Sequence, residues 1–89
     1  MKMEGILAEL EGTADKLGVK LTYESLGDGV SGGGLCKVRG APRVIIERRS
    51  SLGEKVATLA KALASLGVEG MHLSTDARQI VELYRRETP

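Results

Sequence analysis

Residues 31–66 read SGGGLCKVRGAPRVIIERRSSLGEKVATLAKALASL, and this stretch decides the fold. Its first half places apolar and basic residues in alternation on both sides of Gly40-Ala41-Pro42, which predicts a β-hairpin with its turn at these residues. Its second half repeats apolar residues at helical spacing, namely Leu52, Val56, Leu59, Leu63 and Leu66. The stretch therefore predicts a hairpin followed by an amphipathic helix.

The hydrophobic pattern also predicts a register for the hairpin. A turn at residues 40–42 pairs Val38 with Val44 and Cys36 with Ile46, and these four side chains then share one face that is directed at the core. The opposite face carries Leu35, Lys37, Arg39, Arg43, Ile45 and Glu47. In this register Cys36 is a small buried side chain packed in the core.

The helix after the hairpin has a defined start and a second stripe of small residues. Ser50 or Ser51 can cap it, and Glu54 can complete a capping box. The small residues permit close contact with another helix, either the last helix of this chain or the same helix of a second subunit. They are Ala57, Ala60 and Ala64.

The flanking sequence adds two helices and one strand. Residues 3–17 have helical apolar spacing, residues 19–24 alternate as a strand does, and Ser74 or Thr75 can cap a last helix. The glycine-rich residues 27–34 predict a loop, and they lack the G-K-[ST] of a phosphate-binding loop. We therefore expect one α+β domain, residues 1–89, of order α-β-β-β-α-α, with a small antiparallel three-stranded meander under the helices.

The composition indicates a small protein with an aliphatic core. Phe and Trp are absent, so Leu, Val, Ile and Ala must fill the core, and cores of this size are often completed by oligomerisation. No stretch reaches the ~20 apolar residues of a membrane span. The single cysteine excludes an internal disulfide. We expect a cytoplasmic protein without a membrane partner.

Few residues could support catalysis or bind a metal. Cys36 is the only thiol and His72 the only imidazole, and a nucleophilic cysteine needs a neighbour that stabilises its thiolate. One histidine cannot supply the three or four ligands of a zinc site. We therefore expect no catalytic residue, no metal site and no cofactor, in a protein that is not an enzyme.

Two resemblances concern the hairpin and the helix. The segment GGLCKVRG, residues 33–40, resembles a hairpin found in small uncharacterised bacterial proteins, which implies no known function. The order of R-V-I-I-E-R and a capped helix is similar to the strand–helix core of ImmA/IrrE-type zinc peptidases. The helix of those peptidases carries H-E-x-x-H, whereas residues 54–66 read EKVATLAKALASL. The resemblance therefore implies a strand–helix core without zinc or peptidase activity.

The net charge of the chain is +1, but residues 36–50 hold five basic residues against one acidic residue, a local charge of +4. This locally basic, partly aliphatic hairpin is the expected partner surface, made of Leu35, Lys37, Arg39, Arg43, Ile45, Arg48 and Arg49. Mixed arginine and aliphatic surfaces suit protein partners. We therefore expect a protein–protein interaction or homodimerisation module. The alternative is nucleic-acid or anionic-ligand binding through residues 37–49, although no aromatic is available there to stack on bases.

Overall fold

The computed structural model describes residues 2–27 and 33–87. Its elements follow the order α-β-β-β-α-α, so the predicted α+β class and element order are confirmed. They are α1 (Met3–Lys16), β1 (Lys20–Glu24), β2 (Gly33–Val38), β3 (Ala41–Glu47), α2 (Leu52–Leu66) and α3 (Thr75–Glu87). Among the described residues no helix combines the length and the apolar character needed to cross a membrane.

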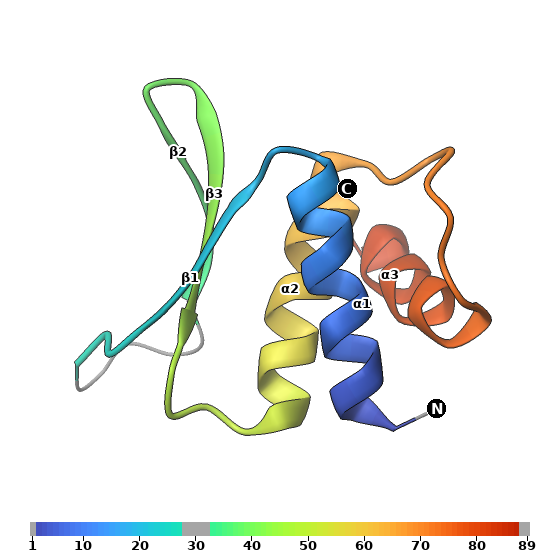
Figure 1. Ribbon diagram of the computed structural model, residues 1–89, viewed down its shortest axis with the longest axis horizontal. Coiled ribbons are helices and arrows are strands. Elements are labelled where there is room, and N and C mark those ends of the chain that lie inside the picture. The colour runs from blue at the N-terminus through green and yellow to red at the C-terminus, as the bar shows by residue number, and fades with distance from the viewer. Residues whose placement is uncertain (1, 28–32, 88–89) are drawn as a thin grey trace.

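The elements form three layers (Figure 1). The sheet is the first layer, α1 and α2 lie side by side on one of its faces, and α3 packs on the far side of these two helices. No helix of the described chain covers the other face of the sheet (Figure 1). Two contacts place α3: Ser74 caps it by accepting a hydrogen bond from the Ala77 N–H (3.2 Å), and Glu9 of α1 accepts one from the Ser74 N–H (2.6 Å).

The sheet is mixed, so the prediction of an antiparallel meander was wrong. The strand order is β1-β3-β2, with β1 parallel and β2 antiparallel to the central strand β3. The parallel pairing sets Leu21 beside Val44 and Tyr23 beside Ile46, which collects the apolar side chains of both strands on the face that the helices cover. As a consequence β2 is an edge strand, whereas a meander would have placed it in the centre.

The register of the hairpin also differs from the prediction. The turn consists of Arg39 and Gly40, whose φ angles of 53° and 82° both lie in the left-handed region. Two-residue turns of this kind match the twist of paired strands. Leu35 then pairs with Val44 and Cys36 with Arg43, a shift of three residues from the predicted register. An odd shift turns every side chain of β2 to the opposite face. Cys36 is therefore exposed on the uncovered face, and its predicted place in the core was wrong.

The core itself is aliphatic, as the composition requires. Leu10, Ile46, Leu59 and Leu63 are among its largest fully buried side chains, and Val44 lies with them. The predicted inward direction of Val44 and Ile46 is thus confirmed. The predicted capping box of α2 is confirmed at Ser51, which accepts a hydrogen bond from the Glu54 N–H (3.1 Å) and donates its own N–H to the Glu54 carboxylate (3.2 Å).

Candidate functional site

The structure divides the predicted basic surface between two faces of the sheet. Arg43 and Ile45 lie on the uncovered face, because their neighbours Val44 and Ile46 are buried against the helices. Leu35 shares the helix-facing side with its partner Val44, and Lys37 follows two residues later on that side. Arg39 lies in the exposed turn, and Arg48 and Arg49 are exposed after the end of β3. These seven residues therefore do not form one surface.

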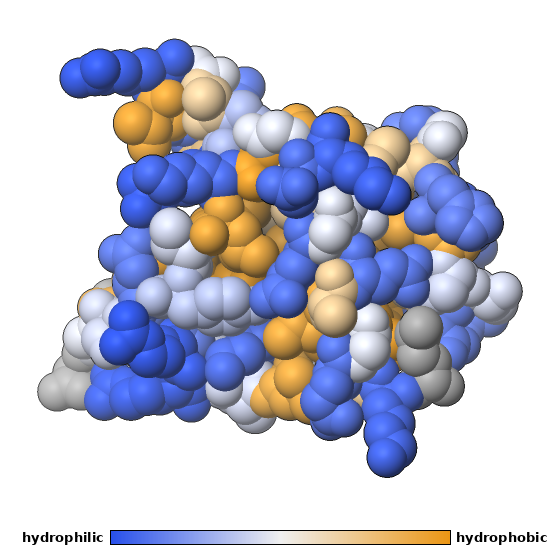
Figure 2. Space-filling view, viewed as in Figure 1, coloured by the Kyte–Doolittle hydropathy of each residue, from blue (hydrophilic) through white to orange (hydrophobic). Residues whose placement is uncertain are grey.

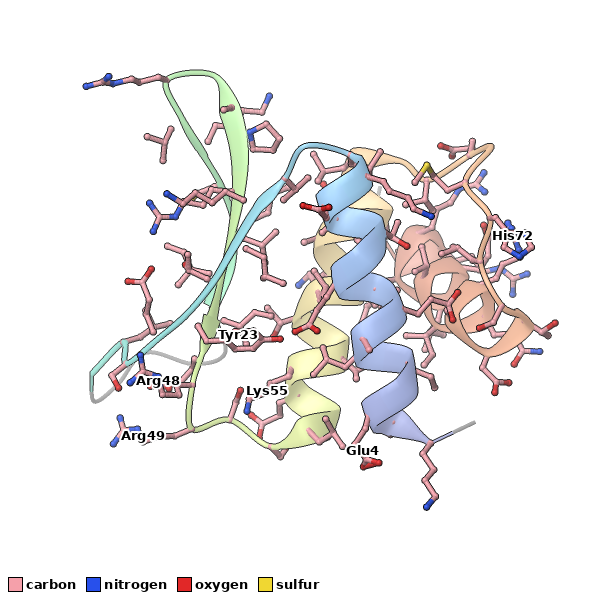
Figure 3. All side chains as sticks on the ribbon, viewed as in Figure 1. Glu4, Tyr23, Arg48, Arg49, Lys55 and His72 are labelled. Atoms are coloured by element: carbon pink, nitrogen blue, oxygen red, sulfur yellow. The ribbon has the colours of Figure 1, made fainter. Side chains whose placement is uncertain are left out.

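Several of the basic side chains have partners within the molecule. Arg43 forms an ion pair with Glu24 of β1 (3.0 Å), and Arg49 forms one with Glu47 (3.4 Å). The Arg48 guanidinium donates a hydrogen bond to the Tyr23 carbonyl (3.3 Å). Figure 3 shows Arg48 and Arg49 pointing away from the helices. The local excess of positive charge is thus reduced by neighbouring carboxylates, which weakens the case for a phosphate-binding surface.

The predicted alanine surface is largely occupied inside the molecule. Ala60 is fully buried in the core, and Ala64 is half-buried against it. Ala57 is also half-buried, and it lines a groove beside β2. Ala60 therefore cannot meet a second subunit without opening the core.

The edge position of β2 leaves part of its backbone without a strand partner. Because the hairpin turn has two residues, the pair that flanks it is hydrogen-bonded, and bonded and non-bonded pairs alternate along the ladder. Cys36 therefore exchanges hydrogen bonds with Arg43, whereas Leu35 and Lys37 direct their N–H and C=O groups to the open edge. Among the described residues no strand pairs with this edge.

A groove of about 430 Å³ runs beside the open edge. β2 forms one wall, α2 forms the other, and Tyr84 of α3 contributes to the lining. The residues that line it are Gly33, Gly34, Leu35, Ala57, Thr58, Lys61, Ala62, Ser65 and Tyr84. Most of these side chains are small or absent, so a backbone can approach both walls closely.

Gly33 begins β2 in a conformation that only glycine adopts readily. Its φ angle is 101°, and a Cβ atom built there would lie 1.9 Å from the Ile45 carbonyl oxygen. Gly34 differs, because a Cβ atom on it would meet no atom within 4 Å. The first glycine is therefore needed for the entry of β2 into the sheet, and the second leaves open space on the edge strand.

Glu47 holds the connection that leaves β1. Its side chain is nearly buried, and it accepts hydrogen bonds from the N–H groups of Arg49 (2.7 Å) and Leu26 (3.1 Å). These two backbone donors, Arg49 first, lower the pKa of the Glu47 carboxyl below its ordinary value of 4.5. The carboxylate thus ties the segment after β1 to the end of β3, next to the start of β2.

We expect Glu47→Gln to lower the unfolding temperature at neutral pH, because an amide offers one acceptor oxygen where the carboxylate offers two. A carboxyl whose pKa is lowered by folding stabilises the protein above its unfolded pKa, and that contribution is lost as the pH falls through the folded pKa. The difference in unfolding temperature between wild type and Glu47→Gln should therefore be largest at pH 7 and should become smaller towards about pH 3. Thermal unfolding followed by circular dichroism at both pH values measures it.

The matched control is Glu4→Gln, at an exposed position in the first turn of α1. It should unfold close to wild type at both pH values. Some pH dependence will remain in every variant, because hydrogen bonds from Ser74 and Thr22 also lower the pKa values of Glu9 and Glu24. An equal gap between Glu47→Gln and wild type at both pH values would contradict the role assigned to this carboxylate.

Tyr23 joins the sheet to both helices of the middle layer. It points from β1 towards α1 and α2 (Figure 3), where its hydroxyl donates a hydrogen bond to the Glu11 carboxylate. The Lys55 ammonium lies 5.7 Å from the ring centroid. Burial of the ring, together with the bond to Glu11, raises the pKa of the Tyr23 phenol above its ordinary value. These contacts join the sheet to the helices and are internal to the molecule. The groove beside β2 is therefore the stronger candidate for a binding site.

The remaining titratable groups are dispersed. His72 lies in the segment before α3, on the side of the molecule away from the sheet (Figure 3), so it is remote from Cys36 in β2. Among residues 2–27 and 33–87, no three His, Cys, Asp or Glu side chains gather as metal ligands would. Figure 2, seen from the side of α1, shows a mostly hydrophilic surface from which the tip of the hairpin projects.

The groove beside β2 and its basic residue, Lys61, were not predicted from the sequence. Thr58, Lys61 and Ser65 follow one another at helical spacing on α2, and this polar stripe was the available signal. This stripe indicates a binding surface only once the strand order is known, because the strand order places the open edge of β2 beside it. No protein-family model, no curated protein and no solved structure matches this chain.

Proposed function

We propose that the protein is a non-enzymatic interaction module that binds an extended segment of a partner protein along β2. The observation that carries this proposal is the open edge of β2 with α2 beside it. An extended peptide can add to such an edge as a further strand. Main-chain hydrogen bonds then supply affinity, and the pockets that receive alternate side chains supply specificity.

The geometry of the groove suits a strand better than a helix or a nucleic acid. A strand added to β2 would run about 4.8 Å from it, and alternate side chains would point towards α2. There they would meet Ala57, Ala62 and the polar stripe that includes Thr58. The Leu35 and Lys37 backbone groups would pair with the incoming chain. Of the basic side chains that favoured the nucleic-acid alternative, Arg43 and Arg49 are ion-paired with carboxylates, and Lys37 lies on the side of the groove.

A peptide selection tests the proposal. Linear peptides of about nine residues, long enough to span β2, are displayed on phage with random sequence and selected on the whole protein. We expect selected peptides to bind with dissociation constants of about 10 μM, as transient interactions do. In ¹⁵N-labelled protein they should shift the amide signals of Leu35 and Lys37 more than those of α3.

Lys37→Pro and Lys37→Ala form the matched pair of variants. Proline removes an N–H that faces the open edge, which an edge strand tolerates, whereas alanine removes only the side chain. Lys37→Pro should bind the selected peptides at least about tenfold more weakly than Lys37→Ala. Should Lys37→Pro fail to fold, the amide shifts of the wild type still decide the matter. Peptides that shift only residues outside β2 and α2 would show that the proposal is wrong.

A further inference from the structure

Among the described residues that line the proposed groove, one side chain is basic. Of these nine residues, Lys61 is the only Lys or Arg, and none is Asp or Glu. Lys61 is exposed, and it forms no ion pair with a described residue. The wall that α2 presents to an added strand is therefore positively charged.

The charged residues near the groove also favour a positive charge there. Lys37 lies on the helix-facing side of β2, two residues beyond Leu35, so its ammonium group is on the same side of the sheet as α2. The acidic residue nearest in sequence on α2, Glu54, lies seven residues, about two turns, before Lys61 and is bound in the capping box. A segment with an acidic side chain would thus meet complementary charge, whereas a basic segment would be repelled.

Resting on the function proposed above, we infer that the segment bound along β2 carries an Asp or Glu whose carboxylate pairs with Lys61. The inference follows from the alternation of side chains in the added strand. Side chains that point towards α2 lie above Thr58, Lys61 and Ser65, so one position of the segment faces the ammonium group. Ser65, about one turn after Lys61, carries a hydroxyl group that can donate a further hydrogen bond to this carboxylate, whereas the Thr58 hydroxyl already donates to the Glu54 carbonyl (2.9 Å).

Selection of peptides with two charge variants tests this inference. On wild type, peptides that shift the Leu35 and Lys37 amides should be enriched in Asp or Glu at one position. On Lys61→Glu, the same position should favour Lys or Arg, because the charge of the wall is reversed. Lys61→Gln should keep binding but weaken a selected acidic peptide about tenfold, and replacing the acidic residue of that peptide by its amide should have a similar effect.

Lys16→Glu is the matched control, since Lys16 is an exposed lysine on α1 that does not line the groove. It should select the same acidic peptides as wild type. Peptides that bind at β2 without an acidic preference, or a preference unchanged in Lys61→Glu, would overturn the inference and leave the proposed function standing. Failure to select any peptide that shifts the β2 amides would overturn both.

Discussion

Gly33→Ala is expected to destabilise the protein by about 4 kcal/mol, because two penalties fall on one residue. An alanine at φ 101° is strained, and its methyl group would overlap the Ile45 carbonyl oxygen of the central strand. Neither atom belongs to a flexible side chain, so relief requires the first pair of the β2–β3 ladder to open. Urea unfolding followed by circular dichroism measures the loss as a lower midpoint.

Gly34→Ala is the matched control one residue later. Its added methyl group meets no atom within 4 Å, and its φ angle lies outside the left-handed region. The free energy of unfolding should stay within about 0.5 kcal/mol of wild type. Equal behaviour of the two variants would contradict the described entry of β2 into the sheet, and with it the position of the open edge.

Ala60→Glu is expected to unfold the protein, because Ala60 is buried within a single molecule and not between two subunits. Ala60 is completely buried between elements of one molecule, so the new carboxylate would have neither space nor a partner. The cost of an unpaired carboxylate forced into a close-packed core equals or exceeds the total stability, about 5–10 kcal/mol, of a domain of this size. Circular dichroism at low concentration, combined with light scattering, should show loss of helix and no folded monomer.

The control for this substitution is Ala8→Glu, at an exposed position of α1. It introduces the same side chain into a helix at the surface and should change the free energy of unfolding by about 0.5 kcal/mol or less. A folded monomeric Ala60→Glu protein would instead mean that Ala60 faces another subunit, as a helix-to-helix dimer through the alanine residues requires.

The local elements could be predicted because each depends on residues near in sequence. The capping box at Ser51 and Glu54 and the buried repeat at Val56, Leu59 and Leu63 are properties of α2 alone. The inward faces of β3 also followed from alternation. Such local patterns are compatible with few alternative conformations, and the structure agrees with the predictions made from them.

The strand order could not be read in the same way. The pairing of β1 with β3 joins residues about 23 positions apart, and no local motif marks a parallel neighbour. The hairpin register depended on which glycine-containing turn forms, and Arg39-Gly40 replaced the turn expected around Pro42. Both differences concern β2, which lies at the edge of the sheet and not in its centre, and whose side chains point to the faces opposite to those predicted. The candidate site therefore emerged only from the three-dimensional arrangement.

The open edge of β2 could also pair with the same edge of another copy of the protein and cause aggregation. β2 has only six residues, and it carries Lys37 where its backbone faces outward. Short length and an edge lysine both discourage edge-to-edge pairing. The same lysine, together with Lys61, admits acidic segments and disfavours a second copy of this basic strand. The features that protect the edge thus also select its partner.

Amide hydrogen exchange of the free protein, resolved by residue, tests most directly whether the β2 edge is open for binding. The structure predicts that the Leu35 and Lys37 amides exchange near the rate of an unprotected chain, whereas the Cys36 amide, bonded to Arg43, exchanges at least about 100-fold more slowly. Addition of a selected acidic peptide should then slow exchange at Leu35 and Lys37. Protection of these two amides in the free protein at low concentration, equal to that of Cys36, would show that the edge is already paired and would contradict the proposed mode of binding.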